Sequence, residues 1–161
     1  KDKSQIKQLA SGQQYDLGTC KIDIIEAALA SSLEENHNEN ESSAIMKITD
    51  NGKSVVFTGD ATEEEEIAAA AASIKADVLK VSHHGSKTSS SYEFLQAVHP
   101  GLAVISVGAD NKFGHPAPET LEKLQAIGAK ILRTDQAGNI KVVFDGSNCT
   151  WYSYRYQGNY F

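Results

Sequence analysis

The stretch ADVLKVSHHGS, residues 76–86, joins an apolar run to a polar turn rich in histidine and hydroxyl groups. Its first seven residues predict a strand, because a short apolar run that ends in a polar turn is typical of a buried strand. Two further apolar runs end in polar residues in the same way: Ser54–Thr58 before Gly59-Asp60, and Leu102–Val107 before residues 108–116. The nearly all-apolar run at 102–107 indicates a strand that is buried on both faces.

Helix and hairpin signals lie between and around these runs. Asn51-Gly52 separates Ala44–Ile48 from Ser54–Thr58 and favours a type I′ hairpin, since both turn residues tolerate positive φ. Helices are expected at residues 62–73, 90–98 and 118–127, and further strands at 20–25, 131–134, 140–144 and, rich in aromatic residues, 149–161. Strands that alternate with helices predict an α/β fold with a mixed sheet and helices packed on one or both of its faces.

The composition and charge of the chain limit the classes of protein to which it can belong. The 161 residues are 40% hydrophobic and 22% charged, which indicates one globular domain. Apolar runs of the roughly 18–20 residues that span a membrane are absent, and we expect no membrane contact by this chain itself. The net charge is −6 without a basic cluster, which argues against avid non-specific binding of nucleic acid by this chain alone.

The two cysteines, Cys20 and Cys149, lie far apart in the sequence and form no CxxC pair. A zinc site built from thiolates is therefore excluded. Two free thiols in the core and one disulfide between the first and the last strand remain as alternatives.

The residues that follow the three apolar runs carry the candidate chemistry. Asp60 follows the first run, His83-His84 the second, and His115 the third. Neutral imidazole binds zinc, manganese or iron and also serves as a general acid or base. Neighbouring residues of an extended chain point to opposite faces, so we expect only one of the two adjacent histidines to face the site.

Each of these signatures alone also has an ordinary structural explanation. Asp60 could begin a helix, and His83-His84 could be a surface turn. His37 in a polar loop and His99 before a proline are expected to be solvated rather than to bind a ligand. The ends of three successive strands meet at one edge of a sheet, however, so together the signatures predict a shared metal or phosphate site.

Six stretches of residues 40–144 form a recognisable series: NESSAI at 40–45, FTGD at 57–60, ADVLKVSHHGSKTS at 76–89, ISVG at 105–108, NKFGHP at 111–116 and RTD at 133–135. In order and in spacing they closely resemble the ComEC-type branch of the metallo-β-lactamase superfamily, a branch that includes a domain of the competence protein for DNA internalisation.

The resemblance implies roles for individual residues. Asp60 corresponds to a carboxylate that holds metal and often bridges two ions. His84 and His115 take the positions of further metal ligands or catalytic groups. Contacts to the substrate phosphate are implied for His83, Ser86, Lys87 and Asn111.

One hallmark of the family is missing, because His-x-His-x-Asp-His occurs nowhere in the sequence. We therefore expect residues 1–161 to be the C-terminal half of a metallo-β-lactamase-like αββα sandwich. A divalent ion, zinc or manganese, is implied for the intact protein, whereas this chain alone is expected to bind it weakly or not at all. The apolar sheet face should then be covered by the missing N-terminal half or by a second copy of the chain.

The function that the resemblance implies is hydrolysis of a phosphodiester in DNA or a related phosphorylated polymer, in which metal-activated water attacks phosphorus. The location implied is outside the cell or at the outer face of the cytoplasmic membrane. A lactonase or other ester hydrolase of the same fold is one alternative. A binding module without catalytic activity is the other.

Overall fold

The computed structural model describes residues 9–27, 43–146, 148–154 and 157–160, the last range for its backbone only. Seven strands form one mixed sheet, in which each strand lies next to its neighbour in the sequence. The first four are antiparallel, and β4 to β7 are parallel. The strands are β1 Gln14–Leu17, β2 Cys20–Glu26, β3 Ile45–Asp50, β4 Lys53–Phe57, β5 Val78–Lys80, β6 Leu102–Ile105 and β7 Lys130–Arg133.

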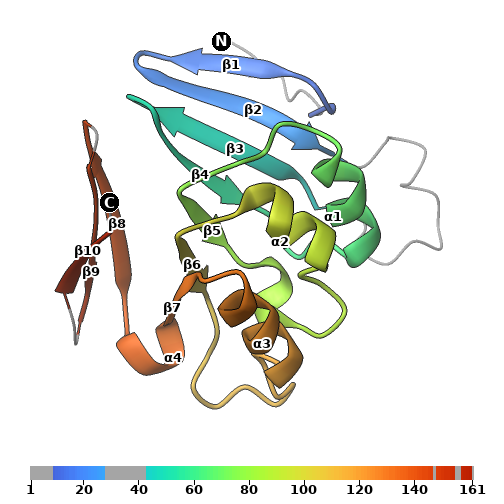
Figure 1. The fold of residues 1–161 in the computed structure, drawn as a ribbon, viewed down its shortest axis with the longest axis vertical. Coiled ribbons are helices and arrows are strands. Elements are labelled where there is room, and N and C mark those ends of the chain that lie inside the picture. The colour runs from blue at the N-terminus through green and yellow to red at the C-terminus, as the bar shows by residue number, and fades with distance from the viewer. Residues whose placement is uncertain (1–8, 28–42, 147, 155–156, 161) are drawn as a thin grey trace, which may run out of the picture.

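Three helices cover one face of this sheet and connect its parallel strands (Figure 1). They are α1 Glu63–Ala70, α2 Tyr92–Val98 and α3 Pro118–Ala126, and a short α4 at Thr134–Ala137 follows β7. The α/β class and the mixed sheet expected from the sequence are confirmed. Helix α1 ends three residues earlier than expected, since the chain turns there to bury Ile74 in the core. Among the described residues, none of the helices is long and apolar enough to cross a bilayer.

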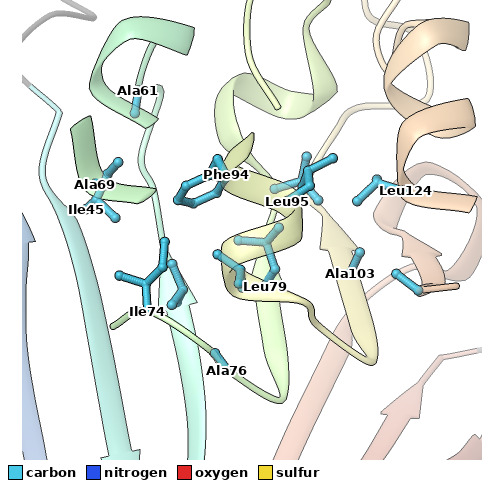
Figure 2. Close-up of a cluster of buried hydrophobic side chains, with 14 of the residues drawn as sticks. Ile45, Ala61, Ala69, Ile74, Ala76, Leu79, Phe94, Leu95, Ala103 and Leu124 are labelled. Atoms are coloured by element: carbon cyan, nitrogen blue, oxygen red, sulfur yellow. The ribbon is translucent and has the colours of Figure 1, made fainter. Parts of the chain in front are cut away.

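The main hydrophobic core lies between the helices and the sheet. Figure 2 shows Phe94 and Leu95 of α2 facing the side chains of Leu79 and Ala103 on the central strands. All four side chains are buried. Burial of one such side chain stabilises the fold by about 1.5–3 kcal/mol, so this core holds β5 and β6, whose ends carry the candidate site, in place.

A second, three-stranded antiparallel sheet covers part of the opposite face. It consists of β8 Ile140–Asp145, β9 Asn148–Ser153 and β10 Gln157–Tyr160, with β9 in the centre. The single aromatic-rich strand expected at 149–161 is thus two strands, β9 and β10. Cys149 and Trp151 of β9 pack against Leu102 and Leu132, and Cys149 and Cys20 are both free thiols rather than a disulfide.

Cross-strand pairing places five apolar residues in one row on this second face. Ile22 pairs with Ile48, Ile48 with Val55, Val55 with Val78, and Val78 with Leu102. Leu102 and Val78 are buried under the small sheet, whereas Ile22 and Ile48 are half-buried. The chain therefore covers the part of this face at Val78 and Leu102 with its own β8 and β9, contrary to the expectation for the whole face, and cover by another polypeptide stays a prediction for the part at Ile22 and Ile48.

Candidate functional site

The candidate residues follow β4, β5 and β6, three parallel neighbours whose carboxyl ends lie at one edge of the sheet. Thr58-Gly59-Asp60 follows β4, the one-turn 3₁₀ helix Ser82–Gly85 follows β5, and residues 106–117 follow β6. Such an edge is where open α/β sheets place their ligands.

Asp60 is held by a tight approach between two backbone segments. Gly59 has a φ of +55°, and a Cβ at that position would lie 3.1 Å from the Ser43 hydroxyl oxygen. The absence of a side chain lets Ser43 accept a hydrogen bond from the Asp60 N–H at 3.0 Å. Thr58, which is buried, donates its hydroxyl to the Lys80 carbonyl at 2.9 Å and joins this turn to β5.

The two adjacent histidines do not lie on an extended chain. Both have left-handed backbones, with φ of 44° at His83 and 55° at His84, and the His83 N–H donates to the Gly59 carbonyl. The expectation that they point to opposite faces is wrong for this reason. The His83 ring centroid lies 6.3 Å from that of His84 and 5.8 Å from that of His115, so the three rings form one cluster.

Hydrogen bonding determines the proton arrangement on the His84 ring. Its Nδ1 lies 2.6 Å from the Ser106 carbonyl oxygen. A carbonyl can only accept, so Nδ1 carries a proton and donates it, and in the neutral ring the lone pair is on Nε2. Nε2 lies 3.8 Å from Oδ1 of Asp60. An imidazole oriented through one nitrogen and facing a carboxylate with the other is suited to bind a metal ion.

His115 is placed by a loop that Asn111 organises. The Asn111 Oδ1 accepts the N–H groups of Phe113 and His115, and its Nδ2 donates to the carbonyls of Gly108 and His115. The structure therefore brings Asp60, His83, His84 and His115 together, while the Asn111 amide is engaged inside the loop.

The two remaining predicted contacts differ in accessibility. Ser86 is buried, its hydroxyl lies 3.0 Å from the Thr88 hydroxyl, and its carbonyl accepts from Thr120. Lys87 is exposed to solvent. Of the two histidines expected to be solvated, His99 is exposed, and His37 lies outside the described residues.

A pocket of about 430 Å³ adjoins the histidine cluster. Its walls come from the turn after β5, the loop after β6 and the start of α4. The lining residues are His84, Ser106, Val107, Gly108, Asn111, Phe113, His115 and Thr134. A larger pocket of about 500 Å³, lined by Lys47, Lys75, Asp77 and His99 among others, contains none of the candidate residues.

Burial and like charge alter the acidity of one of these histidines. The pKa of His115 is lowered from its usual value, first by burial and then by the neighbouring His83 and His84. His115 is thereby favoured in the neutral form, which can bind a metal or accept a proton.

Sequence reasoning missed two charged side chains that support the site. Lys80 donates its Nζ to the Gly59 carbonyl at 2.9 Å, and burial lowers its pKa against the opposing effect of Asp60. Glu66 of α1 is 0% exposed and accepts the Ser82 hydroxyl and the Ser91 N–H. A signal was present for Lys80, a lysine inside an apolar strand, whereas nothing in the run of four glutamates at 63–66 singles out Glu66.

The donors fit a divalent metal ion as part of a ligand set. The Asp60 carboxylate and the His84 imidazole are ligand types that zinc and manganese both accept. Zinc sites need three or four protein ligands, and among the residues that the structure describes no group of three or more His, Cys, Asp or Glu is arranged to hold an ion. Asp60 and His84 thus supply two donors, with His115 nearby.

Comparison with known proteins finds one matching family model and several proteins of similar sequence. Residues 26–109, which include Asp60, His83 and His84, match the family model described as the metallo-beta-lactamase superfamily. The ComE operon protein 3 of Bacillus subtilis is 42% identical over 106 residues, 65% of this chain and 14% of its own length. The competence protein ComA of Neisseria gonorrhoeae is 35% identical over 116 residues, 70% of this chain and 17% of its own.

A third relative, recombination protein 2 of Haemophilus influenzae, is 37% identical over 106 residues, 66% of this chain and 14% of its own. The chain thus spans only 14–17% of the length of these relatives. A solved structure from Parabacteroides distasonis, provisionally described as a metal-dependent hydrolase, has a TM-score of 0.52 at 16% identity. The match covers 79% of this chain and 56% of the solved chain, and at this identity it supports the fold alone.

Proposed function

Because the chain belongs to the metallo-β-lactamase superfamily, we propose that it is part of a metal-dependent hydrolase that cleaves phosphodiester bonds of DNA or a related phosphorylated polymer. The observation that carries this proposal is the pairing of Asp60 with His84. Their facing atoms lie 3.8 Å apart, and the other ring nitrogen of His84 is held by Ser106. The relatives named competence protein ComA and recombination protein 2 support DNA as the substrate.

Each residue has a proposed task. Asp60 and His84 hold the ion, and Lys80 steadies the Gly59 carbonyl beside Asp60. A divalent ion bound there, zinc or manganese, supplies Lewis acidity toward water and the phosphoryl oxygens. His115, whose lowered pKa favours the neutral ring, serves better as a ligand or proton acceptor than as the acid for the leaving oxygen.

The proposed phosphate contact is Lys87, the exposed cation of the turn after β5. His83, which lies within the ring cluster, is the proposed donor of a hydrogen bond to a second phosphate oxygen. Ser86 and Asn111 act through the backbone: they hold the turns that carry Lys87 and His115.

Since Asp60 and His84 alone are too few for a stable zinc site, we propose that a second polypeptide segment supplies the remaining ligands. The N-terminal half of the family fold is the favoured candidate, and a second copy of the chain is the alternative. The half-buried Ile22 and Ile48 and the 39%-exposed Phe57 mark the part of the sheet face where it would pack. For the assembled protein we propose a location outside the cell or at the outer face of the cytoplasmic membrane.

The test uses this chain together with the proposed N-terminal half of the family fold. A labelled oligonucleotide is incubated with the protein and Mn²⁺ or Zn²⁺, and cleavage is followed by gel. We expect Asp60→Asn and His84→Gln each to lower the rate by at least about 100-fold, as loss of a metal ligand or catalytic group commonly does. His99→Gln, at an exposed histidine that lines the other pocket, is the matched control.

The outcomes separate the alternatives. Cleavage that is unaffected by Asp60→Asn would contradict the assigned site. Oligonucleotide binding without cleavage under either metal would favour the binding module, and hydrolysis of lactones or carboxylic esters instead would favour the other alternative.

A further inference from the structure

Phe113 is exposed in a way that packing does not explain. Its side chain is 81% exposed, whereas most described large hydrophobic side chains are buried or half-buried. It nevertheless lines the 430 Å³ pocket next to His84 and His115. An exposed aromatic ring beside a candidate active site is a typical binding group, because a ring in water gains free energy when a ligand covers it.

One face of this ring already has a partner. The rings of Phe113 and His115 are stacked, with centroids 5.8 Å apart and planes inclined by 17°. His115 in turn meets His83 edge to face. Since His115 covers one face and the side chain is mostly exposed, the other face of Phe113 is open to a ligand.

The loop is also organised before any ligand binds. The Phe113 N–H donates to the Asn111 side chain, which also accepts the N–H of His115. The backbone on both sides of the ring is thereby held without help from a ligand. A preorganised aromatic group loses little conformational entropy on binding, so more of the stacking energy appears as affinity.

We propose that Phe113 is a stacking platform for an unpaired nucleobase of the strand whose phosphodiester is cleaved. This inference rests on the proposed function and specifies its substrate as single-stranded nucleic acid next to the cleaved bond. In a duplex both faces of a base are already stacked, so Phe113 can cover only a base that has left the stack. Aromatic platforms bind single strands without reading sequence, because every base has a π face.

Exposed lysines on the two segments that carry His84 and Phe113 suit a polyanion. Lys112 precedes Phe113, and Lys87 lies on the turn that carries His84, both exposed; Asp110 is the one acidic residue of the loop 108–116. Sites for single-stranded nucleic acid usually combine cations that contact the phosphates with an aromatic ring on which a base stacks.

The test compares two labelled oligonucleotides of about fifteen units, oligothymidylate and an abasic strand with the same backbone and charge. Binding to this 161-residue chain is measured by fluorescence anisotropy at low salt. We expect oligothymidylate to bind about tenfold tighter, within the range that stacking of a base on an aromatic ring provides. Phe113→Ala should abolish the difference, and Phe113→Trp should retain it.

Two controls keep the result specific. Tyr15→Ala removes a 39%-exposed ring from β1, the edge strand on the far side of the sheet from β6 and β7, and should leave the preference intact. Thermal melts should show little change for Phe113→Ala, because the side chain is exposed. Equal affinity for both strands, including no detectable binding of either, overturns the proposal; equal tight binding would indicate recognition of the sugar-phosphate backbone alone. The cleavage assay with Asp60→Asn does not depend on this outcome, so the two proposals fail separately.

Discussion

A Cβ atom on Gly85 would lie 2.6 Å from the Cβ of Pro116. Gly85 also has a φ of +81°, and its carbonyl accepts the Ala117 N–H at 2.8 Å. The turn that carries His84 and the loop that carries His115 are therefore joined backbone to backbone. Only glycine permits this contact without displacing one of the two segments.

Gly85→Ala should destabilise the protein and separate the two loops. Left-handed backbone costs a non-glycine residue about 1–2 kcal/mol, and forced overpacking typically adds about 1–3 kcal/mol. We expect the free energy of unfolding, measured by urea denaturation, to fall by about 2–5 kcal/mol.

Gly128→Ala is the matched control for this variant. Gly128 has a similar φ of +77°, but no atom lies within 4 Å of the position its Cβ would take. The free energy of unfolding of Gly128→Ala should therefore fall only by the cost of the backbone strain, about 1–2 kcal/mol. Equal losses for the two variants would show that the contact with Pro116 does not matter.

The elements that sequence predicts well are those set by local chemistry. Asn51-Gly52 favours a type I′ turn, and the structure has Asp50 paired with Lys53 and positive φ at both central residues. The apolar run at 102–107 contains β6, which ends at Ile105 and lies between β5 and β7, since continuous apolar residues suit a strand buried on both faces.

The conformation at His83-His84 depends on residues far away in the sequence. In an extended chain the side chains of adjacent residues alternate, which predicts that the two histidines point to opposite faces. In the structure, however, the His83 N–H donates to the Gly59 carbonyl after β4, and Gly85 packs on Pro116. Neither contact is visible in the local sequence. In the same way, a run of four glutamates indicates a favourable helix start, and only the tertiary fold shows that Glu66 is buried against Ser82.

Glu66 should make the stability of the protein depend on pH. Burial, the dominant effect, raises its pKa in the folded state above the ordinary 4.5, although the hydrogen bonds from Ser82 and Ser91 oppose the shift. The folded state then holds the proton more tightly than the unfolded state. Its contribution to stability is largest below about pH 4.5 and decreases as the pH rises from there through the raised pKa.

Glu66→Gln removes this titration while keeping the shape of the side chain. We expect the free energy of unfolding of the wild type, relative to that of the variant, to decrease as the pH rises above about 4.5, as urea unfolding at each pH would measure. Glu64→Gln, an exposed position of the same helix, should show no such trend. A difference that is constant with pH would contradict the raised pKa.

This chain alone should bind zinc more weakly than micromolar. Asp60 and His84 provide two facing donors, and His115 lies nearby, whereas stable zinc sites hold three or four ligands in fixed geometry. Isothermal titration calorimetry with ZnCl₂ measures this directly. Micromolar or tighter binding that Asp60→Ala abolishes would show that no second segment is needed.

Asn111→Ala should loosen the loop that carries Phe113 and His115. The variant loses four hydrogen bonds, two accepted from the N–H groups of Phe113 and His115 and two donated to the carbonyls of Gly108 and His115. Each such bond contributes about 0.5–1.5 kcal/mol net, so we expect amide hydrogen exchange at Phe113 and His115 to accelerate by at least about tenfold.

Asn111→Asp separates the two halves of this network. The carboxylate still accepts both N–H groups but can no longer donate to Gly108 and His115, so exchange at the two amides should lie between that of the wild type and that of Asn111→Ala. Lys112→Ala, at an exposed position in the same loop, should leave exchange unchanged. If Asn111→Ala exchanged no faster than Lys112→Ala, the loop would be held by other contacts, and the preorganisation on which stacking at Phe113 depends would have to come from them.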